Sequence, residues 1–390
     1  MIPYGRQDIS EEDIQAVIDV LRSEYLTQGP AVPSFEKVVA DYTGAAYGVA
    51  VNSATSALHV ACLALGVGKG DTVWTSPISF VASSNCALYC GADVDFVDID
   101  PLTYNMSIDA LSAKLEKAEK EGKLPKVVIP VHLAGQSCHM KSIHKLGKKY
   151  GFRIIEDASH AIGGRYLGEP VGNCKYSDIT IFSFHPVKII TTGEGGMALT
   201  NDYDLASKMT KYRSHGITRV PEEMTCSPHG GWYYQQIDLG FNYRMTDMQA
   251  ALGLSQMKQI DEFVAKRHEI AKRYDKLLLD CGLTLPYQHC DTYSAFHLYI
   301  IRLKTGESKF THRDIFDRLR SHGILVNLHY IPIYSHPFYQ SFGYNKADFP
   351  EAEAYYSEAL SIPMYTTLTE SEQQFVVDSI KTPLGYQNLF

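Results

Sequence analysis

The stretch ITIFSFHPVKIITTGEGGMAL, residues 179–199, decides the fold that we expect for this chain. Its first part, residues 179–184, is a short run of β-branched and aromatic residues, which is typical of a buried strand. Pro186 then fixes φ and removes a backbone donor, so the chain turns immediately before Lys188. Glycines at positions 193, 195 and 196 let the backbone that follows approach a neighbour or a ligand closely. The stretch therefore predicts a strand that ends in a constrained turn carrying a lysine.

Lys188 has two interpretations when it is considered alone. A lysine amine that is held at the end of a strand and partly desolvated is what Schiff-base chemistry with a carbonyl compound requires. A surface lysine beside a glycine hinge has the same local sequence, and most lysines are solvated charges. Other features of the chain are needed to choose between these two interpretations of Lys188.

The composition describes an ordinary globular protein. A length of 390 residues suits a large domain, expected at residues 1–274, and a smaller one at residues 275–390. With 21% charged residues, a formal net charge of −8 and no basic patch, the chain is not expected to bind nucleic acid. We see no apolar run of the length of a membrane span and no signal-type N-terminus, so we expect a cytoplasmic location.

The eight cysteines are scattered without a C-x-x-C pair. Cys86 and Cys90 share one helical face, but a structural zinc site needs four ligands and no second pair is near them in the sequence. We expect buried free thiols and no metal site.

Strands and helices are expected to alternate over the first 160 residues, which predicts an α/β fold with a mostly parallel sheet covered on both faces. Sites in such folds gather at the carboxyl ends of the strands, where Asn52, Asp157 and Lys188 all fall. The expected strands are residues 49–51, 72–75, 93–97, 127–131 and 153–156, and the expected helices between them are residues 54–65, 79–89, 107–121 and 140–150.

The segment NSATSAL, residues 52–58, joins a short strand to an apolar helix. The unpaired N–H groups and the dipole of a helix N-terminus converge at such a turn and can bind an anion, and the hydroxyl groups can add bonds to a phosphate. A well-capped helix without a ligand explains the segment equally well.

The segment FRIIEDASHAIGG, residues 152–164, places Asp157 and His160 where a buried strand leaves the sheet. A carboxylate there can hold a cationic partner, and the histidine can lie close to the same partner. The alternative is an aspartate that caps a helical turn. A metal site is a third option, but one aspartate and one histidine are too few ligands.

The second half of the chain predicts a smaller α+β domain. Thr246 and Asp247 should cap a long helix over residues 246–274 that bridges the two domains. Strands are expected near residues 298–303 and 325–329, with helices near residues 311–322 and 349–360. The aromatic stretch NLHYIPIY, residues 327–334, suits either a wall of a ligand cleft or a core strand.

One cofactor requires the anion-binding helix start, the strand-end acid and the strand-end lysine together. Pyridoxal 5′-phosphate (PLP) needs a phosphate cradle, an acid at its ring nitrogen and a Schiff-base lysine. The motifs EDASHA (residues 156–161) and SFHPVKIITTGEGG (residues 183–196) resemble those of the DegT/StrS family of nucleotide-sugar aminotransferases, within the fold-type I PLP enzymes. The resemblance covers essentially the whole chain. It implies a large domain with a seven-stranded, mostly parallel sheet flanked by helices, and a smaller C-terminal α+β domain.

The resemblance also implies roles for individual residues. Lys188 would form the Schiff base and Asp157 would pair with the ring nitrogen. Asn242, in GFNYR, would reach a phosphate across the interface of a homodimer. The remaining residues implied to bind the cofactor are Ala54 and Thr55 (phosphate), Phe80 (ring stacking), His160 (ring hydroxyl side) and Ser183 (phosphate).

Within this family, EYLTQG, TSPISFVA, YRSHG and HYIPIY are most similar to members that aminate C4 of a UDP-linked 4-keto-6-deoxy-N-acetylhexosamine in pseudaminic acid biosynthesis, with L-glutamate as donor. The substrate contacts implied are Tyr4, Glu24, Tyr25, Leu26, Thr27, Asn327, Leu328, His329 and Tyr330. Another 4-keto or 3-keto nucleotide sugar, a binding protein without turnover and a metal-dependent enzyme are the alternatives. Family members that carry histidine in place of the lysine are dehydratases, and Lys188 argues against that activity here.

Overall fold

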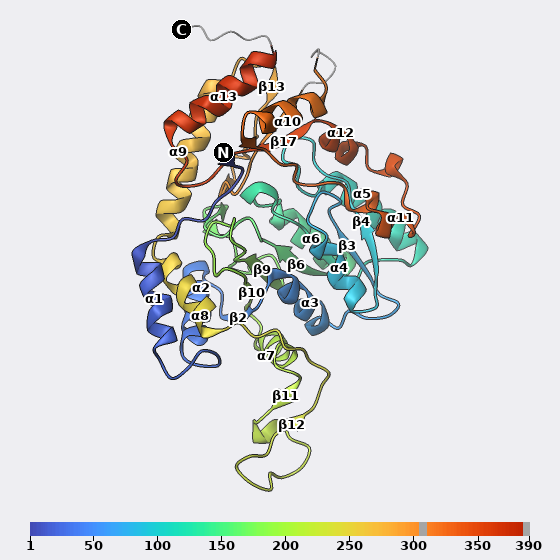
Figure 1. Cartoon of the computed structure of the whole chain (residues 1–390). Helices are drawn as coiled ribbons and strands as arrows, with labels where there is room; N and C mark the ends of the chain where they lie inside the picture. The colour runs from blue at the N-terminus through green and yellow to red at the C-terminus, as the bar shows by residue number, and fades with distance from the viewer. Residues whose placement is uncertain (304–309, 385–390) are drawn as a thin grey trace.

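The computed structural model describes residues 1–303 and 310–384, and a seven-stranded sheet lies at its centre (Figure 1). The strand order is β2-β10-β9-β6-β5-β3-β4. In this sheet β10 runs antiparallel to both of its neighbours, and the other six strands are parallel to one another. The mostly parallel sheet expected from the sequence is confirmed. The strands are β2 (Tyr47–Val51), β3 (Thr72–Thr75), β4 (Asp93–Phe96), β5 (Val127–Ile129), β6 (Arg153–Asp157), β9 (Ile179–Ser183) and β10 (Gly196–Thr200).

Helices cover both faces of this sheet. Alternate residues of a strand point to opposite faces, and apolar side chains on both faces have to be buried. Ile181 packs into the core between the sheet and α3, α4 and α7, whereas its neighbour Phe182 packs into the core on the opposite face. Trp74 and Ile154 contribute to a third apolar cluster, with α5 and α6. The covering helices are α2 (Ala31–Thr43), α3 (Ala54–Ala64), α4 (Ala82–Tyr89), α5 (Ile108–Glu121), α6 (Met140–Tyr150), α7 (Tyr203–Tyr212) and α8 (Asp247–Met257).

The helix expected over residues 246–274 is two consecutive helices, α8 and α9 (Ile260–Leu278). Thr246 caps α8 as predicted, in a capping box with Gln249. The chain leaves regular helical geometry at Gln259, where φ is −110° and ψ is 2°. Arg267 of α9 is buried and donates hydrogen bonds to the carbonyl oxygens of Phe296, His297 and Met364. These bonds connect α9 with the C-terminal part of the chain.

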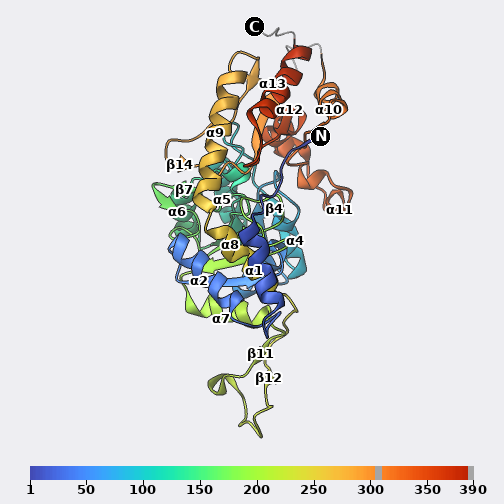
Figure 2. The same cartoon turned by 60° about the vertical axis from the view of Figure 1, so that its left-hand side comes forward.

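The C-terminal part builds a second layer with its own apolar core above the seven-stranded sheet (Figure 2). A three-stranded sheet of order β13-β15-β17 lies against α10 and α13. The second half of α9 also packs into this core, so the domain boundary after residue 274 stays a prediction. The elements are β13 (Leu283–Thr284), β15 (Tyr299–Leu303), β17 (Ala359–Ile362), α10 (His312–Ser321), α11 (Pro337–Gln340), α12 (Pro350–Glu358) and α13 (Glu370–Leu384).

The strand expected near residues 325–329 is only β16 (Ile324–Leu325), which pairs in parallel with β1 (Ile2–Pro3) at the N-terminus. This pairing carries the chain from α1 (Glu11–Leu21) up to the C-terminal layer and places Tyr4 between the two layers. Because β16 ends at Leu325, the aromatic residues His329 and Tyr330 lie outside the strand and can line a cavity.

A hairpin arm, residues 217–239, projects from the body beyond α7 (Figures 1 and 2). It holds β11 (Ile217–Thr218), β12 (Gln235–Gln236) and exposed apolar side chains, among them Trp232 at 77% and Leu239 at 75% exposure. In the described part of the chain, no helix combines the length and the apolar character needed to cross a bilayer. The remaining short elements are β7 (Arg165–Tyr166), β8 (Glu169–Pro170), β14 (Thr292–Tyr293) and the 3₁₀ turns at Leu133–Gly135, Pro221–Glu223, Ile333–Ser335 and Lys346–Asp348.

Candidate active site

A cavity of about 940 Å³ lies at the carboxyl ends of the parallel strands. Its floor is formed where β2, β6 and β9 end, and its roof by residues 327–330 after β16. This volume is within the usual range for sites that hold small molecules. The sequence-predicted residues that line it are Tyr4, Ala54, Thr55, Phe80, Asp157, His160, Ser183, Lys188, Asn327, Leu328, His329 and Tyr330.

The N-terminus of α3 opens into the cavity and provides an anion cradle. Ser53 is the N-cap, and its hydroxyl accepts from the N–H of Ser56. The N–H groups of Ala54 and Thr55 come earlier in the helix, where no intrahelical acceptor exists. Gly196 lies against this turn, since a Cβ atom there would come within 2.5 Å of the Ala54 nitrogen. The missing Cβ keeps the cradle open.

Asp157 ends β6 and is 4% exposed. One carboxylate oxygen accepts from the Ser83 hydroxyl at 2.6 Å, and the other accepts from the hydroxyl and the N–H of Ser159 at 2.6 and 3.2 Å. The Ser83 hydroxyl also contacts that of Ser79 at 2.7 Å. Three donors therefore fix the orientation of the carboxylate. A carboxylate that pairs with a cationic partner needs such a fixed orientation.

Lys188 follows β9 on the turn predicted from Pro186, and its backbone N–H donates to the His185 carbonyl at 2.9 Å. Its side chain reaches the cavity that Asp157 lines. Burial lowers the pKa of Lys188 from 10.5 to about 8, and the negative charge of Asp157 opposes this shift. The amine is therefore a better nucleophile near neutral pH than an exposed lysine.

His160 lies beside this pair in a defined tautomer. Its Nδ1 accepts from the Ala134 N–H at 3.3 Å, so the proton is on Nε2, which lies 3.1 Å from the Tyr330 hydroxyl. Burial is the main cause that holds the pKa of His160 well below 6.5, and the charge of Lys188 adds to it. The imidazole is neutral and donates.

The roof is aromatic and largely buried. The ring of Tyr330 lies 6.2 Å from Phe80 and 6.1 Å from His160, and burial raises its pKa. His329 contacts the Ser361 hydroxyl at 2.8 Å through Nδ1, and its ring lies 4.9 Å from that of Tyr4. Burial lowers the pKa of His329 to about 3. This wall offers uncharged donors and acceptors above the lysine.

Five predicted residues do not line the cavity of this chain. Glu24, Tyr25, Leu26 and Thr27 lie in the loop between α1 and α2, where Leu26 accepts from the Asp247 N–H at 3.0 Å. The carbonyl oxygen of Asn242 lies 3.5 Å from the Asn52 side chain, outside the cavity. Their roles as substrate and phosphate contacts stay predictions that a single chain does not test.

Several lining residues were not predicted: Ser79, Ser83, Ser159, Glu194, Gln249 and His297. Ser83 is 74 positions away from Asp157, and no local pattern connects them. Ser159 lies inside EDASHA and could have been named, because a serine two residues after an aspartate commonly bonds back to it. His297 packs on His160 with ring centroids 4.4 Å apart.

The donor set fits pyridoxal 5′-phosphate. The open cradle at Ala54, Thr55 and Gly196 suits its phosphate, the oriented carboxylate of Asp157 suits a protonated ring nitrogen, and Lys188 is an amine of lowered pKa in the same cavity.

The comparison with known proteins agrees with this chemistry. The DegT/DnrJ/EryC1/StrS aminotransferase family profile matches residues 7–381, and the chain belongs to this family of PLP-dependent sugar aminotransferases. It is 38% identical over 381 residues to a UDP-4-amino-4,6-dideoxy-N-acetyl-beta-L-altrosamine transaminase of Campylobacter jejuni, with 97% of this chain and 96% of that protein covered.

Solved structures show the same fold. The structure of Helicobacter pylori PseC, described as an aminotransferase involved in the biosynthesis of pseudoaminic acid, matches with a TM-score of 0.90 at 32% identity, covering 98% of this chain and 99% of that one. The PLP-form of Spr1654 from Streptococcus pneumoniae matches with a TM-score of 0.87 at 29% identity, covering 98% of both chains. The predicted fold class, enzyme class and cofactor are thereby confirmed.

Proposed function

We propose that this aminotransferase moves the amino group of L-glutamate to C4 of a UDP-linked 4-keto-6-deoxy-N-acetylhexosamine, in the cytoplasm and in pseudaminic acid biosynthesis. The observation that carries the proposal is the convergence of Lys188, Asp157 and the α3 N-terminus on one cavity. The sugar is inferred from the resemblance of the substrate-wall motifs and from the names of the relatives.

Different residues of the chain are proposed to bind different parts of the cofactor. Bound pyridoxal 5′-phosphate supplies an electron-accepting ring and an aldehyde carbon that can carry an amino group. Asp157, oriented by Ser83 and Ser159, would keep the ring nitrogen protonated. Ala54, Thr55 and Ser183 would hold the phosphate, and Phe80 would pack against the ring, since all four line the cavity.

Lys188 moves protons in both half-reactions. With the donor bound, its amine would take the proton from Cα of glutamate; the amino group would stay on the cofactor, and water would release the carbon skeleton as 2-oxoglutarate. With the keto sugar bound, the same amine would deliver a proton to C4 of the sugar, which takes up the stored amino group as its keto oxygen leaves as water. One base therefore serves both directions, and ping-pong kinetics follow because the first product leaves before the second substrate enters.

We propose that the sugar is held by Tyr4, Asn327, His329 and Tyr330. They line the cavity on the side of the C-terminal layer and offer neutral hydroxyl, amide and imidazole groups, which match the hydroxyl and acetamido groups of a hexosamine.

We also propose that the active unit is a homodimer. Asn242 and residues 24–27 lie outside the cavity of their own chain, and the hairpin arm exposes Trp232 and Leu239. Exposed apolar side chains on a projecting segment are typical of a surface that a partner covers. A second copy would bring these residues to its neighbour's site.

A substrate panel tests the sugar assignment. The purified holoenzyme is offered glutamate with UDP-linked and GDP-linked 4-keto-6-deoxy sugars, with and without the N-acetyl group, and products are scored by mass. Amination of the UDP-linked N-acetylated sugar supports the proposal. Amination of GDP-linked or non-acetylated sugars alone would refute the pathway and leave the family unchanged. A colourless protein that aminates nothing after PLP is added would favour a binding protein.

A further inference from the structure

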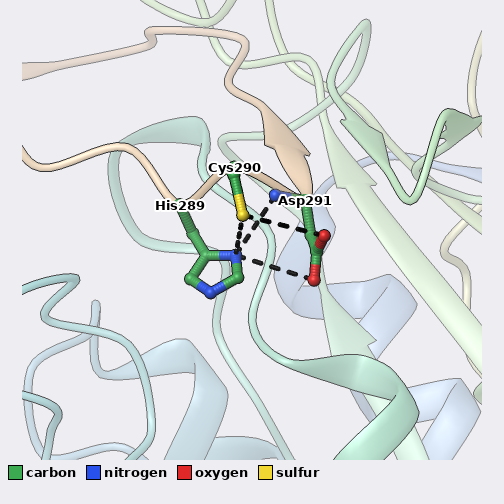
Figure 3. Close-up of side chains that lie close together, drawn as sticks. All are labelled: His289, Cys290 and Asp291. Atoms are coloured by element: carbon green, nitrogen blue, oxygen red, sulfur yellow. Dashed lines mark hydrogen bonds and ion pairs between the residues drawn. The ribbon is translucent and has the colours of Figure 1, made fainter.

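Three consecutive side chains with metal-binding atoms converge on the surface, away from the active site. Figure 3 shows His289, Cys290 and Asp291 on the loop before β14, turned toward one another. The His289 Nδ1 atom lies 3.9 Å from the Cys290 sulfur and 3.8 Å from an oxygen of Asp291. The sulfur lies 3.9 Å from the other oxygen of Asp291. In the described chain, this is the one group of three such residues whose donor atoms all lie within 4.8 Å of one another.

These separations are close to those of a tetrahedral zinc site. Bonds of about 2.3 Å to sulfur and about 2.0–2.2 Å to nitrogen and oxygen give donor-to-donor edges of roughly 3.4–3.6 Å in a tetrahedron. The observed distances of 3.8–3.9 Å exceed these by a few tenths of an ångström, but they involve both oxygens of Asp291, so the carboxylate must rotate to bring one oxygen to both partners. Small side-chain rotations would close the difference.

The tautomer of His289 places the lone pair of Nδ1 toward the cluster. The backbone N–H of Asp291 points at Nδ1 from 3.2 Å, so the ring proton is on Nε2 and Nδ1 faces the cluster unprotonated. A metal would bind at this lone pair, so it would have to displace the Asp291 N–H from Nδ1.

The backbone of the loop is already held in place. The His289 N–H donates to the buried side chain of Gln136 at 2.7 Å, and the His289 carbonyl accepts from the Thr292 hydroxyl at 2.8 Å. The Asp291 carbonyl accepts from the Leu167 N–H at 2.7 Å. A loop that is anchored at both ends loses little conformational freedom when it binds an ion.

A second imidazole lies beside the cluster. The ring of His139, at the start of α6, packs edge-to-face on that of His289 with centroids 4.6 Å apart. This packing holds the His289 ring in place beside Cys290 and Asp291.

From this geometry we propose that His289, Cys290 and Asp291 form a surface site for a divalent cation of the Zn²⁺ class. The mixed nitrogen, sulfur and oxygen donors favour a borderline-soft ion over Mg²⁺ or Ca²⁺. Binding forms a metal–sulfur bond and releases the thiol proton of Cys290 to solvent, and no electron is transferred. The ion would hold residues 289–291 in one conformation outside the active-site cavity, so its effect is on stability and not on amino transfer.

Cobalt titration of the chelator-treated holoenzyme tests this site. Co²⁺ takes the place of zinc and gives a near-ultraviolet charge-transfer band only when a thiolate binds it. We expect one Co²⁺ per chain with this band in the unchanged enzyme, and its loss in Cys290→Ser. His289→Ala should bind at least about 10-fold more weakly, because one of three protein ligands is gone.

Cys226→Ser is the matched control. Cys226 is the other exposed cysteine, and its sulfur contacts Tyr233 and Gln235, without a histidine or carboxylate. It should keep the band. No band in the unchanged enzyme, a band that persists in Cys290→Ser, or a band lost in Cys226→Ser would each overturn the proposal. As a second readout, Zn²⁺ should raise the melting temperature of the unchanged enzyme and of Cys226→Ser, but not that of Cys290→Ser.

Discussion

The hydroxyl of Ser83, on α4, donates a 2.6 Å hydrogen bond to the carboxylate of Asp157 at the end of β6. This bond connects a helix to the acid that we propose faces the cofactor ring, and the Ser79 hydroxyl extends it by a further 2.7 Å contact. Ser83 is thus a positioning residue for the acid.

Ser83→Ala should weaken PLP binding without unfolding the enzyme. A hydrogen bond to a charged group contributes about 1.5–3 kcal/mol, and Asp157 keeps its bonds to Ser159, so we expect a loss of roughly 10-fold in PLP affinity. Titration of apoenzyme with PLP measures this. Ser84→Ala is the control, because Ser84 lies on the same helix but bonds Tyr339. Equal effects of both variants would remove the role assigned to Ser83.

Gly196→Ala should damage the phosphate cradle. Its Cβ atom would come within 2.5 Å of the Ala54 nitrogen and of the Ser53 carbonyl carbon, which are backbone atoms that cannot rotate away. We expect a loss of about 1–3 kcal/mol in the free energy of unfolding and weaker PLP binding, measured by denaturant titration and PLP titration. Gly68→Ala, where a Cβ atom meets nothing within 4 Å, should change neither quantity. An unaltered Gly196→Ala protein would contradict the close approach.

The capture of PLP by apoenzyme should depend on pH through Lys188. Only the neutral amine attacks the aldehyde, so the rate should rise with pH and level off once the lysine has lost its proton. Since burial lowers the pKa of Lys188 to about 8, the half-rise should fall near pH 8 and well below 10.5. Stopped-flow absorbance across the pH range measures it. A rate that still climbs steeply above pH 10 would mean that the amine is not desolvated.

The homodimer proposal predicts that two inactive variants complement each other. If Asn242 acts on the partner's site, a Lys188→Ala chain and an Asn242→Asp chain form a heterodimer in which one site carries both changes and the other carries none. Random mixing would then restore about one quarter of the unchanged activity, because half of the dimers are mixed. Unfolding and refolding the two variants together, followed by an activity assay, measures this. No recovery above the separate variants would place Asn242 in its own chain's site or in none.

The residues at the strand ends were predicted better from the sequence than the complete set of strands and helices. Lys188, Asp157 and the start of α3 could be placed because each follows a short apolar run directly. The antiparallel strand β10 was not predicted, because glycines at 195 and 196 conceal its start and its partners β2 and β9 are identified only by the fold. The break between α8 and α9 also has no proline or glycine to mark it.

Contacts between distant segments account for the rest. Ser83 and His297 enter the site through packing of α4 and of the C-terminal layer, and neither has a local pattern that marks it. The His289 cluster was not predicted either, since three adjacent polar residues indicate a metal only once their side chains are known to converge.

The most direct test of the central claim is to locate the covalent bond between protein and cofactor. Borohydride reduction of the PLP-loaded enzyme turns a lysine–cofactor bond into a stable amine, which peptide mass mapping can assign to a position. We expect the added phosphopyridoxyl mass on Lys188, directly after SFHPV in the same peptide, and none on the Lys188→Ala protein. A modified lysine elsewhere, or no modified lysine in an enzyme that is active with PLP, would contradict it.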